Sequence, residues 1–132
     1  MKAYVVDTQI LWWHLTTDQR KLSRTVRRIF EQAERGEALF YVPVLVLVEI
    51  WDINHKLGHP LNFRHLLQVL LQASQFVFIP LDVSDVIVYG ELSAIPDSRD
   101  RIIAAVTRKM DAPLITTDQA IIKSGVVAVI EA

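Results

Sequence analysis

The sequence contains no cysteine, only four glycines and no long hydrophobic run. Without cysteine, disulfide bonds and thiolate-bound metals are excluded. The longest apolar stretch, residues 39–51, is interrupted by Pro43 and Glu49 and is too short to span a bilayer. An acid, Asp7, occurs before any secretory hydrophobic segment could form. We therefore expect a cytoplasmic protein with no membrane anchor.

A strong net charge is also lacking, because 14 Lys and Arg residues balance 15 Asp and Glu residues. Positive charge is nevertheless concentrated in the segment RKLSRTVRR, residues 20–28, which contains no acid. This basic stripe could bind the phosphates of RNA or an acidic partner segment, although a solvated helix face is the more common explanation. The basic stripe consists of Arg20, Lys21, Arg24, Arg27 and Arg28.

The 132 residues have the length of one ordinary domain, and 52% of them are hydrophobic, which is enough for a sizeable core. With 22% charged residues and no repeat or linker, the chain is expected to fold as a single globular domain over 1–132.

Apolar runs and capping residues predict alternating strands and helices. Strands are expected at 3–7, 38–42, 76–80, 113–117 and 126–130. Helices are expected at 8–15, from a Ser23 cap to about 35, at 44–57, from an Asn62 cap to 72, from Ser84 to 92, from an Asp97 cap to 110, and at 119–123. Segment 44–57 is rich in valine and could be a strand, but Pro43 favours the first turn of a helix. The alternation predicts an α/β domain with a mainly parallel central sheet flanked by helices.

Acidic residues recur where strands end or helices begin. Asp7 ends the first strand, Asp118 follows the fourth, Asp97 and Asp100 open a helix, and Glu49 is expected near the start of another. In a parallel α/β sheet these positions lie along one edge, where ligands bind. Each aspartate could instead cap a helix or a turn, and for Asp97 alone the cap is favoured.

Glu49 is the acid that is hardest to explain structurally. Its helical neighbours are apolar or acidic, and no basic residue lies on that local face. Carboxylates that converge repel one another, and a divalent cation relieves this repulsion. Oxygen ligands without cysteine favour Mg²⁺ or Mn²⁺. We therefore expect Glu49 to face the other acids across a metal site.

Other chemistries have little support. The four histidines lack metal-protease spacing, and neither a glycine-rich phosphate loop nor a nucleophile-elbow motif occurs. The neighbouring Trp12 and Trp13 point about 100° apart on a short helix. Both are candidate contacts to RNA or to a partner protein, and at least one is expected to lie against a partner rather than in the core.

Four segments in order resemble the PIN domain family, specifically VapC-type toxins, and the resemblance covers essentially the whole chain. The segments are VVDTQILWW, VEIWDI, IPDSRDRIIAA and LITTDQAI. The resemblance implies a three-layer PIN-like fold and supporting roles for Asp97, Thr116 and Thr8. Gln9 departs from the histidine that is frequent in this branch, at a position expected to be peripheral. The metal-binding and catalytic acids implied by the resemblance are Asp7, Glu49, Asp100 and Asp118.

The resemblance implies an endoribonuclease that requires Mg²⁺ or Mn²⁺ and cleaves RNA phosphodiester bonds with a metal-activated water. It also implies a homodimer that is neutralised by a VapB-type antitoxin. One alternative is a non-catalytic PIN-like module for RNA binding or assembly, although the presence of all four acids disfavours it. A phosphoacceptor receiver domain is less consistent still, because Asp7 is followed by Thr8 and Gln9 and not by an adjacent acid.

Overall fold

The computed structural model describes residues 1–132 and is built on a five-stranded sheet in the order β3-β2-β1-β4-β5. All neighbouring strands are parallel, which confirms the expected α/β architecture. The chain starts at the centre of the sheet, extends it on one side and then returns to extend it on the other. The strands are β1 (Lys2–Val6), β2 (Ala38–Pro43), β3 (Phe76–Ile79), β4 (Leu114–Thr116) and β5 (Val129–Glu131).

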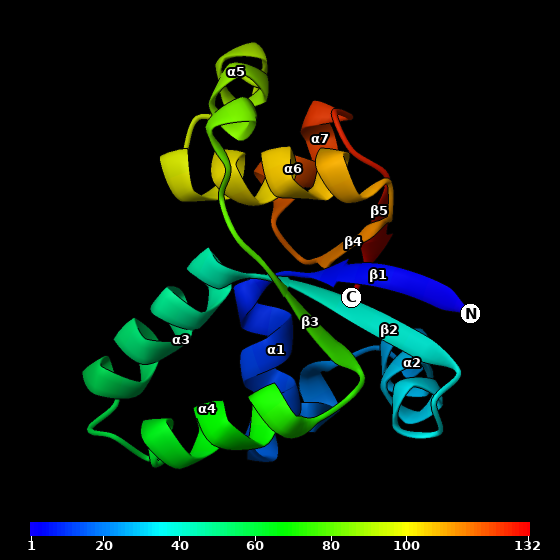
Figure 1. Ribbon diagram of the computed structural model, residues 1–132, viewed down its shortest axis with the longest axis vertical. Coiled ribbons are helices and arrows are strands. Elements are labelled where there is room, and N and C mark those ends of the chain that lie inside the picture. The colour runs from blue at the N-terminus through cyan, green and yellow to red at the C-terminus, as the bar shows by residue number, and fades with distance from the viewer.

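Helices cover both faces of this sheet and complete three layers. Figure 1 shows α1, α2 and α4 on one side and α5 and α6 on the other. None of the helices has the length and apolar character needed to cross a membrane. The helices are α1 (Thr8–Leu15), the 3-10 helix η1 (Thr17–Lys21), α2 (Arg24–Glu34), α3 (Val44–Lys56), α4 (Phe63–Gln72), α5 (Val83–Glu91), α6 (Ser98–Met110) and α7 (Gln119–Ser124).

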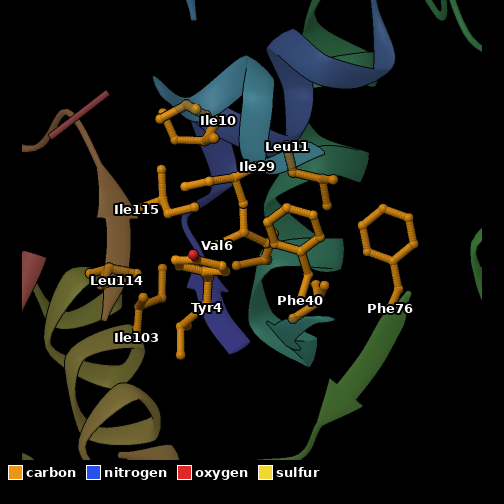
Figure 2. Close-up of a cluster of buried hydrophobic side chains, with 14 of the residues drawn as sticks. Tyr4, Val6, Ile10, Leu11, Ile29, Phe40, Phe76, Ile103, Leu114 and Ile115 are labelled. Atoms are coloured by element: carbon orange, nitrogen blue, oxygen red, sulfur yellow. The ribbon is translucent and has the colours of Figure 1, made fainter. Parts of the chain in front are cut away.

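The hydrophobic core is organised around the central strand. Val5 and Val6 of β1 are completely buried, as expected for a strand covered by helices on both faces. Phe40 of β2 stacks on Phe30 of α2 and on Phe76 of β3, which joins one helical layer to the edge of the sheet. Figure 2 shows this cluster continuing through α1 and α6. Burial of these side chains holds β1 firmly in place.

Most of the expected helix starts are confirmed by capping hydrogen bonds. The Ser23 hydroxyl accepts from the Val26 N–H, and the Asn62 side-chain oxygen accepts from the His65 N–H. The Asp97 carboxylate accepts from the N–H groups of the first turn of α6. The valine-rich segment after Pro43 is a helix and not a strand.

Several expected boundaries differ from the structure by one residue or more, and the differences at α5 and at the last strand have a visible cause. Helix α5 starts at Val83 and not at Ser84, because the Asp85 carboxylate accepts a hydrogen bond from the Asp82 N–H at 2.8 Å and so closes the first turn earlier. The last strand covers Val129–Glu131 and not 126–130. Gly125 ends α7 with a positive φ of 67°, and the chain needs the following residues to turn back toward β4.

The expectation for the tryptophans is wrong for Trp12. Only 4% of Trp12 is exposed, so it cannot present a surface to RNA or to a partner. Trp13 is half-buried against the same core, with the Lys21 ammonium 5.8 Å from its ring. Both indoles find apolar surroundings because α1 contacts η1 and α3 as well as β4 and is therefore covered on more than one side. A partner contact through Trp13 stays a prediction.

An ion pair between α5 and α6 was not expected from the sequence. The Lys109 ammonium donates to the Asp85 carboxylate at 2.7 Å and to the Pro80 carbonyl at 3.1 Å. The Asp85 side chain is only 3% exposed. Burial alone would raise the pKa of Asp85, but hydrogen bonds from Lys109 and from the Asp82 N–H bring that pKa below its ordinary value.

We predict that Lys109→Met lowers the free energy of unfolding by about 2 kcal/mol at pH 7, because it leaves a buried carboxylate unpaired. Since the folded pKa of Asp85 is depressed, the stabilisation is present above its unfolded pKa of 3.8 and is lost as the pH falls through the folded value. Urea unfolding from pH 3 to pH 8 measures this difference. Lys123→Met, at an exposed lysine, is the control. Equal losses for the two variants would contradict the buried pair.

Candidate active site

A polar cleft of about 390 Å³ opens at the carboxyl edge of the sheet, beside the ends of β1 and β4. The sheet order reverses between these two strands, and this is where parallel sheets commonly bind ligands. Of the 11 lining residues only one is hydrophobic. They are Asp7, Thr8, Gln9, Glu49, Asp52, Ile53, Lys56, Arg99, Asp100, Thr117 and Asp118.

Asp7 is the deepest acid of the cleft. It follows β1 directly, is only 8% exposed, and caps α1 by accepting the Thr8 N–H at 2.8 Å. Its other carboxylate oxygen accepts a hydrogen bond from the buried Thr116 hydroxyl. Burial raises the pKa of Asp7; the two hydrogen bonds oppose this rise, and the charge of Asp118 adds to it.

The Thr116 hydroxyl also joins Asp7 to Asp118. While donating to Asp7, it accepts from the Asp118 N–H at 3.0 Å. The Asp118 carboxylate in turn accepts the Ile121 N–H at 3.1 Å and so caps α7. One hydroxyl therefore sets the spacing between the acids that follow β1 and β4.

Asp100 lies in the first turn of α6, and its pKa is strongly raised. Its pKa is raised to about 7, first by burial and then by the charge of Asp118 and a hydrogen bond shared with it. Asp97 and Asp7 contribute further repulsion. Asp97 itself is exposed, is outside the lining of the cleft, and caps the helix through the N–H groups of Arg99 and Asp100.

Glu49 faces the same cleft, but two expectations about it need correction. It is the sixth of the 13 residues of α3 and so does not lie near the start of the helix. It also has a basic neighbour, since the Arg99 guanidinium of α6 lies 3.8 Å from its carboxylate. This neighbour could not be seen along α3 alone. Burial raises the pKa of Glu49, while a 2.8 Å hydrogen bond from the Thr8 hydroxyl and the charge of Arg99 oppose the rise.

Six lining residues were not anticipated as part of the site, namely Gln9, Asp52, Ile53, Lys56, Arg99 and Thr117. Gln9 lines the cleft, so the expectation that it is peripheral to the acids is wrong. It is the second residue of α1 and follows the Asp7 cap by two positions, which keeps it near that acid. Arg99 and Lys56 bring positive charge to a site for which only acids and supporting threonines were expected. The position of Arg99 directly before Asp100 was the available signal for its inclusion.

The basic stripe lies away from this cleft. Arg20 and Lys21 belong to η1, which follows the far end of α1, and an eight-residue helix is about 12 Å long. The three arginines of α2 are exposed and border a shallow hollow with Glu31. The structure therefore brings the acids together without bringing the basic stripe to them, and a role for the stripe in binding RNA or an antitoxin stays a prediction.

The donor set of the cleft fits a hard divalent cation. The available groups are carboxylate oxygens supported by hydroxyls, and their repulsion is visible in the raised pKa of Asp100. No three acidic or histidine side chains converge closely enough to form a finished coordination shell in the structure. The chemistry of the residues thus suits Mg²⁺ or Mn²⁺.

Comparison with known families agrees with this geometry. The model of the PIN domain family matches residues 4–125, nearly the whole chain. The chain belongs to the PIN domain family. No curated protein sequence matches it significantly.

Solved structures share the PIN fold at low sequence identity. VapBC2 from Rickettsia felis, bound to a DNA fragment from its promoter, aligns with a TM-score of 0.75 at 18% identity and covers 98% of both chains. FitAB bound to the IR36 DNA fragment gives a TM-score of 0.67 at 16% identity over 97% of this chain and 94% of that one. FitAcB from Neisseria gonorrhoeae gives 0.63 at 16% identity over 96% and 95%.

We predict that Asp100→Asn raises the thermal unfolding midpoint of this PIN domain in metal-free buffer at pH 8. The folded pKa of Asp100, about 7, lies above the ordinary value of 3.8, so its ionisation costs folded-state stability as the pH rises between these values. Little of the gain should remain at pH 3.5, where most of the wild-type side chains are protonated in both states. Asp111→Asn, at an exposed acid outside the cleft, is the control, and a lower midpoint for Asp100→Asn at pH 8 would contradict the repulsion.

Proposed function

We propose that this PIN domain is an endoribonuclease that requires Mg²⁺ or Mn²⁺ and acts as the toxin of a toxin–antitoxin pair in the cytoplasm. The observation that carries the proposal is the gathering of four acids from separate segments around one open cleft. The acids are Asp7, Glu49, Asp100 and Asp118. Burial and the neighbouring carboxylates raise the pKa values of three of these acids, although one neutral substitution would relieve part of the repulsion. A site that retains such a cost is characteristic of function.

The four acids would hold the metal, and when bound it would supply a Lewis acid that activates water and stabilises charge on a phosphate. The remaining work belongs to residues of the chain. Thr116 orients Asp7, Thr8 orients Glu49, and the Asp97 cap places Asp100. We assign Asp97 to positioning, because its Oδ1 accepts hydrogen bonds from two backbone N–H groups of α6 and the residue lies outside the lining of the cleft.

Two exposed apolar surfaces support the proposed protein partners. On α5, Val83, Val86 and Ile87 are 87%, 59% and 71% exposed, and their spacing places them on one helical face. We assign this face to a homodimer contact, since contiguous exposed apolar side chains mark interaction sites. An apolar hollow of about 290 Å³ between α3 and α4 suits a segment of a VapB-type antitoxin. It is lined by Leu47, Val48, Trp51, Phe63 and Leu67.

A non-catalytic PIN module is the alternative function. In such a module the acids would be free to change, and hydroxyl groups that orient them would have no purpose. Both supporting threonines are instead engaged with the acids, so the catalytic assignment is favoured. The two functions differ in one observable, which is RNA cleavage dependent on added metal.

We predict that the wild-type protein cleaves RNA with Mn²⁺ and not in EDTA, and that Asp100→Asn and Asp118→Asn each reduce cleavage by at least 100-fold while remaining folded. Asp97→Asn should keep activity within about tenfold, because Asn caps a helix nearly as well as Asp. Gel assays of a labelled RNA, with circular dichroism for folding, measure these effects. If the RNA stays intact with the wild-type protein in Mg²⁺ and in Mn²⁺, the non-catalytic module is favoured. Loss of activity in Asp97→Asn would place that acid in the catalytic set.

We predict that Ile87→Lys weakens self-association by at least tenfold, because it puts a charge on the apolar face of α5. Light scattering over a concentration series measures the change. Leu71→Lys is the matched control, since Leu71 is 62% exposed on α4, on the opposite side of the sheet (Figure 1). Dissociation caused by Leu71→Lys, with Ile87→Lys unaffected, would move the dimer contact to the other layer.

A further inference from the structure

Arg99 is the cation closest to the carboxylates of the cleft, yet it is not tightly held there. Its guanidinium lies 3.8 Å from Glu49 and 3.7 Å from Asp52, beyond the range of an ordinary hydrogen bond. Its side chain is 56% exposed, so water screens both attractions. The guanidinium can therefore leave these carboxylates at little cost.

Two other basic residues on α6, Arg101 and Lys109, make the contacts expected of a cation that stabilises the fold. Arg101 donates from Nε to the Ile95 carbonyl at 2.9 Å and lies over the ring of Tyr89. Lys109 holds the buried carboxylate of Asp85. Arg99 makes no comparable hydrogen bond, so the fold leaves its planar set of donors available for a ligand.

The position of Arg99 in its helix also argues against a stabilising role. It lies in the first turn of α6, where the positive end of the helix dipole disfavours a cation. The Asp97 cap and Asp100 in the first turn already provide the favourable negative charge. A cation at this end is better explained by what it faces, and it faces the open cleft.

The cleft needs such a cation if a polyanion is to enter it. Five carboxylates line it, and they repel any phosphate chain that approaches. Arg99 and the exposed Lys56 are the two basic residues of the lining, and they come from different helices, α6 and α3. Arginine binds phosphate through two parallel hydrogen bonds, whereas lysine acts as a point charge.

We propose that Arg99, assisted by Lys56, binds a backbone phosphate of the RNA at the mouth of the cleft and so places the chain against the acids. The inference rests on the proposed ribonuclease function and names a substrate-binding residue for it. In the free protein the guanidinium rests between Glu49 and Asp52, and in the complex it exchanges these carboxylates for phosphate oxygens. The exchange lets the substrate bring its own counter-charge to Arg99.

The test compares Arg99→Gln, Arg99→Lys and Arg108→Gln. Arg108 is a closely matched control, because it lies on the same helix, is 45% exposed against 56%, and makes a similarly long ion pair, to Glu91 at 3.9 Å. Binding of a fluorescent single-stranded RNA is followed by anisotropy with Ca²⁺ over a series of salt concentrations, with a gel to verify that the RNA stays intact. Cleavage kinetics with Mn²⁺ are measured on the same proteins.

For Arg99→Gln we expect a Kd for RNA and a KM that are each raised about five- to tenfold, with kcat changed less than threefold. The slope of log Kd against log salt should fall by about one unit, as for the loss of one phosphate contact. Arg99→Lys should keep most of this slope and recover part of the affinity. Arg108→Gln should match the wild type in every measurement.

An unchanged RNA Kd and salt slope in Arg99→Gln would overturn the proposal. So would a variant with weaker Mn²⁺ binding or a lower unfolding midpoint but a wild-type salt slope, since Arg99 would then only organise the acids. If the wild type binds RNA but cleaves none, the ribonuclease function fails, while the assignment of Arg99 is still decided by the Kd and slope. Absence of wild-type RNA binding overturns both.

Discussion

The hydrogen bonds of the Thr116 hydroxyl are the constraint on which the site depends. This buried group donates to Asp7 and accepts from the Asp118 N–H, so it joins the ends of β1 and β4 at the point where the order of the sheet reverses. A buried hydroxyl without partners would be costly, and here both of its roles are filled. These two hydrogen bonds therefore fix the distance between Asp7, which follows β1, and Asp118, which follows β4. The placement of Asp100 beside Asp118 then follows from the docking of α6.

Stability and function pull in opposite directions at this edge of the sheet. Burial and mutual repulsion raise the pKa values of Asp7, Glu49 and Asp100, so ionising them costs free energy in the absence of a counter-charge. Elsewhere the fold compensates in the usual ways, with a continuous apolar core and with Lys109 paired to the one other buried carboxylate, Asp85. The contrast is informative, because a paired acid such as Asp85 belongs to the architecture and an uncompensated one such as Asp100 invites a ligand.

Much of the fold could be predicted from local patterns in the sequence. Ser23, Asn62 and Asp97 each cap a helix that follows them directly in the sequence. The apolar runs of β1 and β2 likewise predict buried strands from local sequence alone. The segment after Gly125 could not be placed in this way, because a run of valines does not reveal where pairing with β4 begins. Trp12 failed for a related reason, since a helix enclosed on several sides has no single inward face.

At the site too, only features that depend on residues close together in the sequence could be predicted. The acids could be recognised because each follows a strand or opens a helix, and a parallel sheet brings such positions to one edge. The contact with Arg99 could not be recognised, because Arg99 and Glu49 lie 50 positions apart in the chain and meet only through the packing of α6 against α3. A search within one turn of Glu49 therefore described this acid as unaccompanied, and it also missed Lys56, which lies two turns further along α3 and lines the same cleft. Once Arg99 and Lys56 are included, the cleft contains both acidic and basic side chains. The acids can attract a divalent cation, and the basic residues can attract the phosphates of a nucleic acid. A cleft with charges of one sign could attract only one of these two ligands.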